Sequence, residues 1–150
     1  MNTLTLEHIQ AEHARIGQLI EQLQTSAQRL LLLREISIEL RPGERYAGLV
    51  LGTDGLANHH LILLPGEAQD VDWKAAKQAA KNFGGELPTR QEQALLYANL
   101  KSEFKEAWYW SGEEHTDSSF AWLQYFSFGY QNYARKSYAG RARAVRRYPS

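Results

Sequence analysis

Apolar side chains in the first thirty residues recur alternately three and four positions apart. This spacing is the a/d pattern of a heptad repeat, sustained over four heptads. Gln, Glu, Arg, Ser and Thr fill the positions between and suit solvent, and Thr5 is placed to cap the start. We therefore predict a helix over residues 5–31 with a narrow apolar stripe: Leu6, Ile9, His13, Ile16, Ile20, Leu23, Ala27 and Leu30.

The stripe of this helix fits two arrangements. A helix of that length is too long to pack usefully on one small domain, so we favour a coiled coil that makes the chain a homo-oligomer through residues 5–31. The alternative is an amphipathic helix folded back on its own domain. His13, at an a position, is expected to set register rather than bind metal. Ile at d positions leaves dimer and trimer both open.

The next segment changes to a period of two, which is typical of strands. On a strand His59 and His60 face opposite sides, so they cannot form a metal pair alone; we expect one surface and one packed histidine. Pro42-Gly43, Asp54-Gly55 and Pro65-Gly66 supply turns. The pattern predicts an antiparallel meander of three strands: Glu35–Leu40, Arg45–Leu51 and His59–Leu64.

Two short helices are predicted after the strands. Asp72 caps a helix over Trp73–Asn82, which Gly84 stops. Thr89 and Glu92 form a capping-box pattern that starts a second helix, which runs to about Leu100. This second helix is expected to bury three residues: Ala94, Leu95 and Ala98.

From Trp108 onward aromatic and polar residues alternate between glycines, which predicts short strands and loops. The last strand is predicted over Ala142–Arg147, with its Ala and Val side chains facing inward. The overall prediction is an α+β protein: residues 1–33 form the coiled-coil oligomerisation helix and residues 35–150 form a domain of two short helices and small antiparallel sheets.

Composition narrows the classes of function. A hydrophobic fraction of 43% suits a globular domain. The absence of cysteine excludes disulfides, thiolate metal sites and cysteine catalysis. No apolar run approaches the ~20 residues of a membrane helix, and the N-terminus lacks a basic-then-apolar signal. We therefore expect no membrane association and a cytoplasmic protein.

The net charge of zero conceals an asymmetry. Residues 1–117 hold 11 basic and 17 acidic side chains, whereas residues 118–150 hold 6 basic and none acidic. One interpretation is that the two regions neutralise each other in the fold. The other is a basic face for an acidic partner or a nucleic acid.

The order of motifs in the second region closely resembles the C-type-lectin-like domains of unknown function found in phages and prophages. Relatives of these domains include formylglycine-generating (sulfatase-modifying) domains and the variable proteins of diversity-generating retroelements. The resemblance spans about residues 45–148 and implies a C-type-lectin-like fold. Its anchors are Trp73, Leu87-Pro88-Thr89-Arg90, Tyr109-Trp110-Ser111, Ala121-Trp122 and Arg143-Ala144-Val145-Arg146.

The resemblance also implies a binding segment. In the retroelement-diversified relatives, the residues just before the closing strand carry the ligand-binding side chains, largely Tyr, Asn and Ser. Tyr offers a large contact area at low entropy cost, and Ser and Asn adapt their hydrogen bonds. The alternative is that half of these aromatics only pack the core. The predicted ligand-binding residues are Tyr125, Ser127, Tyr130, Asn132, Tyr133, Arg135, Lys136 and Tyr138.

Enzymatic alternatives find little support in the residues. The cysteines of a formylglycine-type oxidase are absent, the five histidines lack the spacing of an iron site, and lectin-type calcium motifs are missing. We predict no metal, no cofactor and no catalytic residue. The one polar cluster that resembles chemistry, which we interpret as scaffold, is Ser111, Glu113, Glu114 and His115.

The favoured function is therefore a non-enzymatic, phage- or prophage-type protein-binding module. Its N-terminal helix would display several copies, and its partner would be a host or phage protein, in an accessory or anti-defence role within the host cytoplasm. The first alternative is nucleic-acid binding by the basic aromatic segment, and the second is a structural virion or assembly component. We expect Arg143 and Arg146 to pair with acids such as Glu86, Glu92 or Asp54, which leaves Arg135, Lys136 and Arg141 for a ligand.

Overall fold

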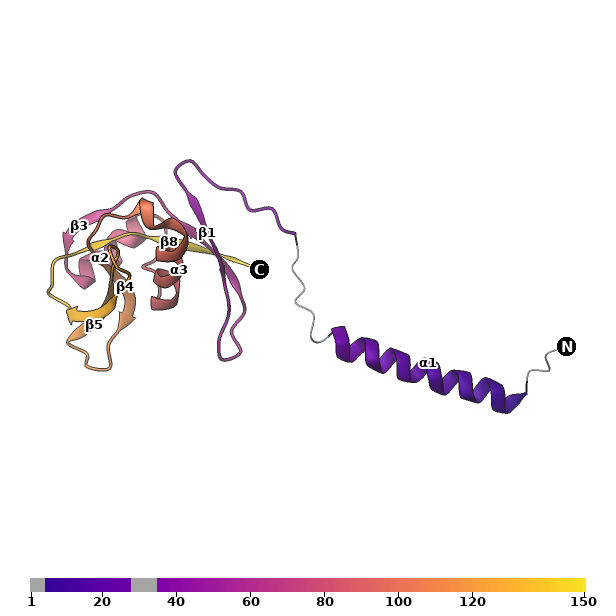
Figure 1. Cartoon of the computed structure of the whole chain (residues 1–150). Coiled ribbons are helices and arrows are strands. Elements are labelled where there is room, and N and C mark those ends of the chain that lie inside the picture. Colours follow the sequence, from indigo (N-terminus) through magenta and orange to yellow (C-terminus); the bar gives the residue numbers. More distant parts are fainter. Residues whose placement is uncertain (1–4, 28–34) are drawn as a thin grey trace. The chain divides into compact units, whose positions relative to one another are not determined.

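The computed structural model describes residues 5–27 and 35–150 of the 150-residue chain (Figure 1). The chain divides into two compact units, Met1–Ile36 and Ser37–Ser150, and each is described by itself. The predicted boundary between residues 33 and 35 adjoins residues 28–34, which lie outside the described residues. That boundary stays a prediction.

The first unit contains one helix, α1, over Leu6–Ala27. The hydroxyl of Thr5 accepts a hydrogen bond from the backbone N–H of His8 at 3.2 Å, which confirms the predicted cap. Residues 28–31 of the predicted helix lie outside the described residues. The coiled-coil association stays a prediction, and five apolar side chains that it would bury are exposed in the single chain: Leu6, Ile9, Ile16, Ile20 and Leu23.

The second unit is an α+β domain, as predicted, with two helices, a single 3₁₀ turn (η1, Lys101–Glu103) and two sheets. The helices are α2 (Trp73–Asn82) and α3 (Arg90–Leu100). The three-stranded sheet has the order β1 (Arg45–Val50), β2 (His59–Leu63), β8 (Val145–Pro149). The five-stranded sheet has the order β3 (Ala68–Val71), β7 (Gly140–Ala142), β4 (Trp108–Glu114), β5 (Phe120–Tyr125), β6 (Gln131–Arg135).

Both helices of the domain begin at the predicted caps. Asp72 accepts a hydrogen bond from the N–H of Ala75 at 2.8 Å, and α2 ends before Gly84, whose φ of 96° suits glycine. At the start of α3, the N–H of Glu92 donates to the Thr89 hydroxyl and the Glu92 carboxylate accepts from the Thr89 N–H. This reciprocal capping box is confirmed.

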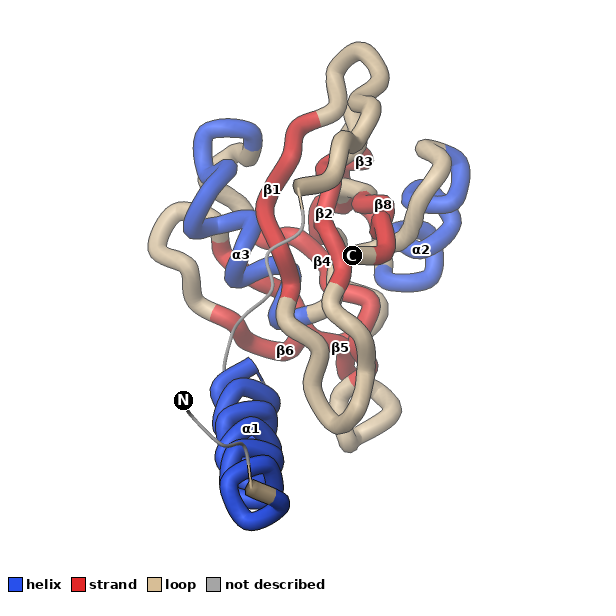
Figure 2. The backbone as a smooth tube through the Cα atoms, turned by 90° about the vertical axis from the view of Figure 1, so that its right-hand side faces the viewer, coloured by secondary structure: helices blue, strands red, loops and turns tan. Residues whose placement is uncertain are grey.

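The five-stranded sheet lies between the two helices, with α2 and α3 on opposite sides of the strands (Figure 2). Successive residues of β4 show this directly, because adjacent side chains of a strand face opposite ways. Trp110 packs in the core on the α2 side, together with Trp73 and Ala76. Tyr109 packs in the core on the α3 side, together with Leu96. We refer to these two faces as the α2 side and the α3 side.

Two strand predictions are wrong. Among the described residues, Glu35–Leu40 pairs with no strand, and its alternating apolar residues are only partly covered: Ile36 and Leu40 are exposed and Ile38 is half-buried. The third strand beside β1 and β2 is instead β8, from the far end of the chain. The predicted last strand over 142–147 is split between β7 and β8, which belong to different sheets. Its inward-facing apolar residues are confirmed as buried: Ala142, Ala144 and Val145.

The buried face of α3 also differs from the prediction. Ala94 and Ala98 are exposed and Leu95 is half-buried. The residues that α3 buries are Glu92, Gln93 and Leu96. The Gln93 amide nitrogen donates to the backbone oxygen of Tyr109 at 3.0 Å, whereas its buried Oε1 has no hydrogen-bond partner among the described residues.

Candidate functional site

The basic residues at the end of the chain mostly have acidic partners. Arg141 pairs with Glu67 at 2.9 Å and Lys136 pairs with Glu114 at 3.4 Å. Arg146 and Arg147 also form ion pairs, described below. Four of the six basic residues beyond position 117 are thus bound to acids of the preceding region, which supports mutual neutralisation over an open basic face.

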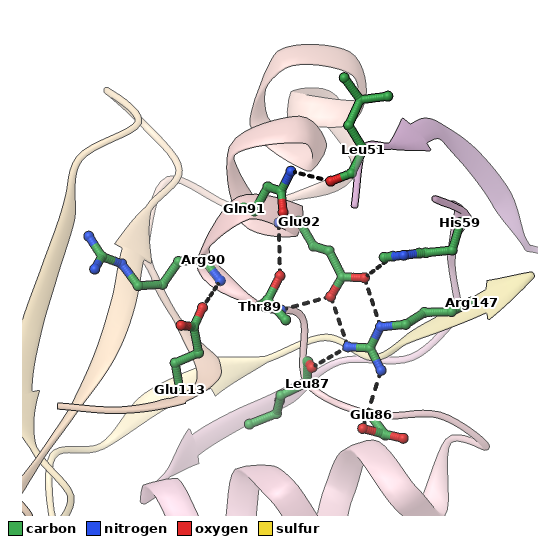
Figure 3. Close-up of polar contacts among 10 residues, drawn as sticks. All are labelled: Leu51, His59, Glu86, Leu87, Thr89, Arg90, Gln91, Glu92, Glu113 and Arg147. Atoms are coloured by element: carbon green, nitrogen blue, oxygen red, sulfur yellow. Dashed lines mark hydrogen bonds and ion pairs between the residues drawn. The ribbon is translucent and has the colours of Figure 1, made fainter. Parts of the chain in front are cut away.

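Arg147 is the centre of a cluster that joins β8, β2 and α3 (Figure 3). Its guanidinium makes two hydrogen bonds of 2.8 Å to the fully buried carboxylate of Glu92 and one of 3.2 Å to Glu86. Nε2 of His59 lies 2.7 Å from the same Glu92 carboxylate. Burial alone raises the pKa of Glu92, but hydrogen bonds from Arg147, Thr89 and His59 outweigh it and leave that pKa below its ordinary value.

The predicted acidic partners of Arg143 and Arg146 are wrong in detail. Arg146 pairs with Glu44 at 2.7 Å, and this hydrogen-bonded pair lowers the pKa of the Glu44 carboxyl. Arg143 donates instead to the backbone oxygens of Glu103 and Leu64, at 2.6 and 2.9 Å. Two of the three acids expected for them, Glu86 and Glu92, bind Arg147 instead.

Strand β6 divides its side chains between the two faces of the sheet. Residues directly opposite on paired strands share a face, and Tyr133 lies opposite Trp122 whereas Asn132 lies opposite Leu123. Leu123 belongs to the core on the α2 side. Asn132 is therefore on the α2 side, and Tyr133 and Arg135 are on the α3 side.

The α2 side carries a continuous set of aromatic rings, which we call the aromatic row: Trp108, Tyr125, Phe128 and Tyr130. Trp108 stacks on Tyr125 with ring centroids 5.1 Å apart, and the next two centroid separations along the row are 6.1 and 5.8 Å. The first two rings are half-buried. Phe128 and Tyr130 are 68% and 60% exposed. The aromatic row thus begins at half-buried rings of the sheet and ends at rings exposed to solvent.

A glycine fixes the turn that presents the aromatic row. Gly129 has a φ of 81°, and a Cβ added there would lie 2.8 Å from the ring of Tyr97. Its N–H donates to the backbone oxygen of Tyr125 at 2.8 Å. Phe128 and Tyr130 flank this glycine, so their exposure belongs to an ordered turn.

A second aromatic group lies on the α3 side, around Trp122. Tyr133 and His115 contact the Trp122 ring, with centroid separations of 5.4 and 5.2 Å. Arg90, the first residue of α3, lies over the same indole at 3.5 Å from its centroid. Trp122 itself is half-buried.

An open cleft of about 630 Å³ adjoins this second group, between the start of α3 and strands β5 and β6. Polar side chains form much of its wall, and Arg90, Glu113 and Gln131 are among them. The Gln131 amide connects to Arg90 twice: it donates to the Arg90 backbone oxygen at 2.6 Å and accepts from Arg90 Nε at 3.0 Å. The cleft wall is therefore held in place by internal hydrogen bonds.

The structure does not bring all eight predicted ligand-binding residues together. Tyr125 and Tyr130 belong to the aromatic row, and Asn132 shares its side of the sheet. The remaining residues are engaged elsewhere or face away. The Lys136 ammonium lies 4.9 Å from the Trp73 ring, Tyr138 contacts the Trp110 ring, the Ser127 carbonyl accepts from the Tyr97 hydroxyl, and Tyr133 and Arg135 face the α3 side.

Sequence reasoning missed several residues of both groups. Phe128 was not predicted as a ligand-binding residue although it is the most exposed ring of the aromatic row. Trp108 could have been found from the pairing of β4 with β5, which places it opposite Tyr125. Arg90 is distant in sequence from Trp122, and no local signal connects them.

The polar cluster at the end of β4 has protein partners throughout. The hydroxyl of Ser111 donates to the backbone oxygen of Trp122 at 2.7 Å, and the Glu113 carboxylate accepts from the Arg90 N–H at 2.5 Å. Glu114 pairs with Lys136, and Nδ1 of His115 accepts from the Asp117 N–H at 3.1 Å. These bonds support the scaffold interpretation.

The described residues contain neither a group of metal-binding side chains nor a membrane-spanning helix. Across residues 5–27 and 35–150, no three His, Asp or Glu side chains are grouped so that they could hold a metal ion. In the same part of the chain, no helix has both the length and the apolar character needed to cross a membrane.

No family model matches this chain, and a search of the curated proteins finds no match.

Proposed function

We propose that this chain is a non-enzymatic protein-binding module, displayed in several copies by α1. The aromatic row is the observation that carries the proposal. Phe128 and Tyr130 are more than half exposed on an ordered turn, next to the half-buried rings of Trp108 and Tyr125. A soluble domain gains nothing in its own core from rings placed there. Contiguous exposed aromatics are typical of surfaces that bind other proteins.

The chemistry of the row suits a protein partner. Aromatic rings bury a large area with few rotatable bonds, and tyrosine adds a hydroxyl for hydrogen bonds. Such residues carry most of the free energy in many interfaces. Asn132, exposed on the same side of the sheet, adds an adaptable amide at the rim.

Multiple copies would strengthen a modest site. The apolar stripe of α1 is exposed at Leu6, Ile9, Ile16, Ile20 and Leu23, and a second copy of the same helix covers such a stripe by a/d packing. Linked sites raise the overall affinity without new contacts, because the second binding event becomes intramolecular. We therefore propose a homo-oligomer through residues 5–31.

We further propose the finer fold and setting that the sequence resemblance implies: a C-type-lectin-like domain of phage or prophage type. The α+β arrangement supports it, as does the place of its anchors, since Trp73 opens α2 and Leu87-Pro88-Thr89-Arg90 leads into α3. The partner is then a host or phage protein met in the host cytoplasm, in an accessory or anti-defence role.

Nucleic-acid binding is disfavoured by the pairing of the basic residues. Among the six basic residues beyond position 117, four form ion pairs and Arg143 binds backbone oxygens. Few phosphate contacts remain, so affinity for a single strand is expected to be weak, with a log–log salt slope of roughly −2 at most.

The test is capture from a bacterial host lysate on immobilised full-length chain. We expect Phe128→Ser with Tyr130→Ser to lose a protein that the wild type retains. Replacing Ile16 and Leu23 by Asp is expected to give folded monomers by light scattering and weaker capture. A protein retained equally by the Phe128/Tyr130 variant would exclude the aromatic row as its site, and a monomeric wild type would exclude the coiled coil.

A further inference from the structure

The guanidinium of Arg90 is fixed in orientation, but part of it has no partner among the described residues. Its guanidinium lies 3.5 Å from the Trp122 ring centroid, and its Nε is fixed on Gln131 at 3.0 Å. Nη1 and Nη2 of Arg90 have no hydrogen-bond or ion-pair partner in the described parts of the chain, and the residue lines the 630 Å³ cleft. A guanidinium already fixed in orientation loses little entropy when it binds.

Arg135 is a second arginine on the same face, and it also lies over an aromatic ring. It lies over the ring of Phe120, 5.9 Å from the centroid, and is exposed. Among residues 5–27 and 35–150, no acid pairs with it. Phe120 and Trp122 are two positions apart on β5, so their Cα atoms stand roughly 7 Å apart. We call Arg90 and Arg135 the arginine pair.

The paired arginines elsewhere in the domain show what this chemistry binds. Arg146 and Arg147 each make two hydrogen bonds to one carboxylate, that of Glu44 and that of Glu92. The planar fork of a guanidinium matches the two oxygens of a carboxylate. Arg146 and Arg147 use Nε and Nη2 for these bonds, whereas Arg90, whose Nε donates to Gln131, offers its Nη1 and Nη2 edge.

Acidic residues near the arginine pair favour a ligand with a few separate carboxylates over a polyanion such as a nucleic acid. Glu113, Glu114 and Asp117 are exposed nearby, and each is engaged: with the Arg90 N–H, with Lys136, and with the Ser119 N–H at 3.0 Å. These three carboxylates repel a polyanion such as a nucleic acid at every phosphate. They penalise a short segment with two separate carboxylates much less.

We propose that the arginine pair binds a protein segment in extended conformation that carries carboxylates at alternate positions. In an extended chain the side chains at i and i+2 point the same way and stand roughly 7 Å apart, the same spacing as the Cα atoms of Phe120 and Trp122, whose rings lie beneath the two arginines. The partner on the α3 side is thus a protein segment with exposed carboxylates. This inference rests on the proposed function only in taking the ligand to be a protein.

The probes are three labelled octapeptides, titrated against the full-length chain by fluorescence anisotropy at about 50 mM salt. One alternates Asp and Ser, one has the same composition with the Asp residues in adjacent pairs, and one alternates Asn and Ser. We expect the first to bind about fivefold more tightly than the second, and the third not to bind. Higher salt weakens the first complex.

Variants separate the fork from net charge. Arg90→Gln and Arg135→Gln are each expected to weaken the alternating Asp peptide about tenfold, which corresponds to about 1.4 kcal/mol. Arg90→Lys keeps the charge and loses the planar fork, so it is expected to weaken binding by severalfold. Arg45→Gln, which removes an exposed arginine paired with Glu103, is the matched control and leaves binding unchanged.

Three outcomes overturn the proposal: no binding of the alternating Asp peptide, equal loss in the Arg45→Gln control, or tighter binding of an oligothymidylate of the same charge. The last result would assign the arginine pair to nucleic acid. None of these three outcomes changes the expected result of the capture experiment, which depends on Phe128 and Tyr130. Failed capture with intact peptide binding would remove the protein-binding proposal for the aromatic row and leave the carboxylate site.

Discussion

Aromatic side chains serve two different purposes in this domain. Trp110 is fully buried, and its indole N–H donates to the backbone oxygen of Val71 at 2.9 Å. Phe128 and Tyr130, on a turn of the same sheet, are mostly exposed and contact each other. The Trp110 ring is buried and its N–H is hydrogen-bonded. The rings of Phe128 and Tyr130 are exposed to solvent and free to contact a partner protein.

Arginines show the same contrast. Arg147 is bound to Glu92 and Glu86, while Arg90 and Arg135 keep guanidinium nitrogens without acidic partners in the described residues. Residue type alone therefore says little about function in this chain. The buried or paired members stabilise the fold, whereas Phe128, Tyr130, Arg90 and Arg135 lie in or beside β5 and β6.

The largest expected effect comes from the interior ring. Trp110→Ala removes a fully buried indole and leaves a cavity between α2 and the sheet, which should cost on the order of 3–5 kcal/mol of unfolding free energy. Trp122→Ala should cost less, because that ring is half-buried. Urea denaturation followed by circular dichroism measures both, and equal costs would break the contrast between interior and outer rings.

Breaking the Arg147 cluster is expected to have the next largest effect. Arg147→Met leaves the buried Glu92 carboxylate without its main partner, at a cost of about 3 kcal/mol. Arg135→Met, at an exposed position without an acidic partner, should change stability by less than about 0.5 kcal/mol. If both variants unfold at the same urea concentration, the division of the arginines into paired and free is wrong.

Acid should reveal the same cluster with a smaller effect. The pKa of Glu92 is lower in the folded chain than its ordinary value of 4.5, so the folded state keeps the carboxylate ionised while the unfolded state takes up a proton. The stabilisation is complete above that value and is lost as pH falls below it. We expect unfolding free energy to fall less steeply with decreasing pH in Glu92→Gln than in the wild type. An unchanged slope would show that Glu92 is not linked to folding in this way.

The smallest effect on stability is expected from the outer rings. Phe128→Ser with Tyr130→Ser removes side chains that cover little of the core, so unfolding free energy should change by less than about 0.5 kcal/mol. Calorimetry of the melting transition checks this. A large destabilisation would mean that the aromatic row packs the fold.

Local signals in the sequence predict the helices of the domain well. The Asp72 cap and the Thr89–Glu92 capping box act within three residues of the helices that they start, so no knowledge of the fold is needed. The alternation of apolar and polar residues over Glu35–Leu40 does not indicate whether a neighbouring strand pairs with this segment. A strand exists only where another strand pairs with it, and β2 pairs with β8 instead.

The division of aromatic residues between core and surface depends on tertiary structure. Phe126 is 1% exposed and Phe128 is 68% exposed, although they are two positions apart and of the same type. The chain turns between them at the end of β5, and Gly129 fixes that turn. A single-residue pattern cannot show this, nor can it show that Arg90 reaches Trp122.

The binding role of the aromatic row is tested most directly by an equilibrium titration of the captured protein against the wild type and three variants of equal oligomeric state. The variants are Phe128→Ser, Tyr130→Ser and Leu51→Ser, which removes another large exposed side chain, 56% exposed, away from the aromatic row and the cleft. We predict that each row variant raises Kd about tenfold or more, as interface hot spots do, while Leu51→Ser stays within about twofold. Equal affinity for all four proteins would contradict the account.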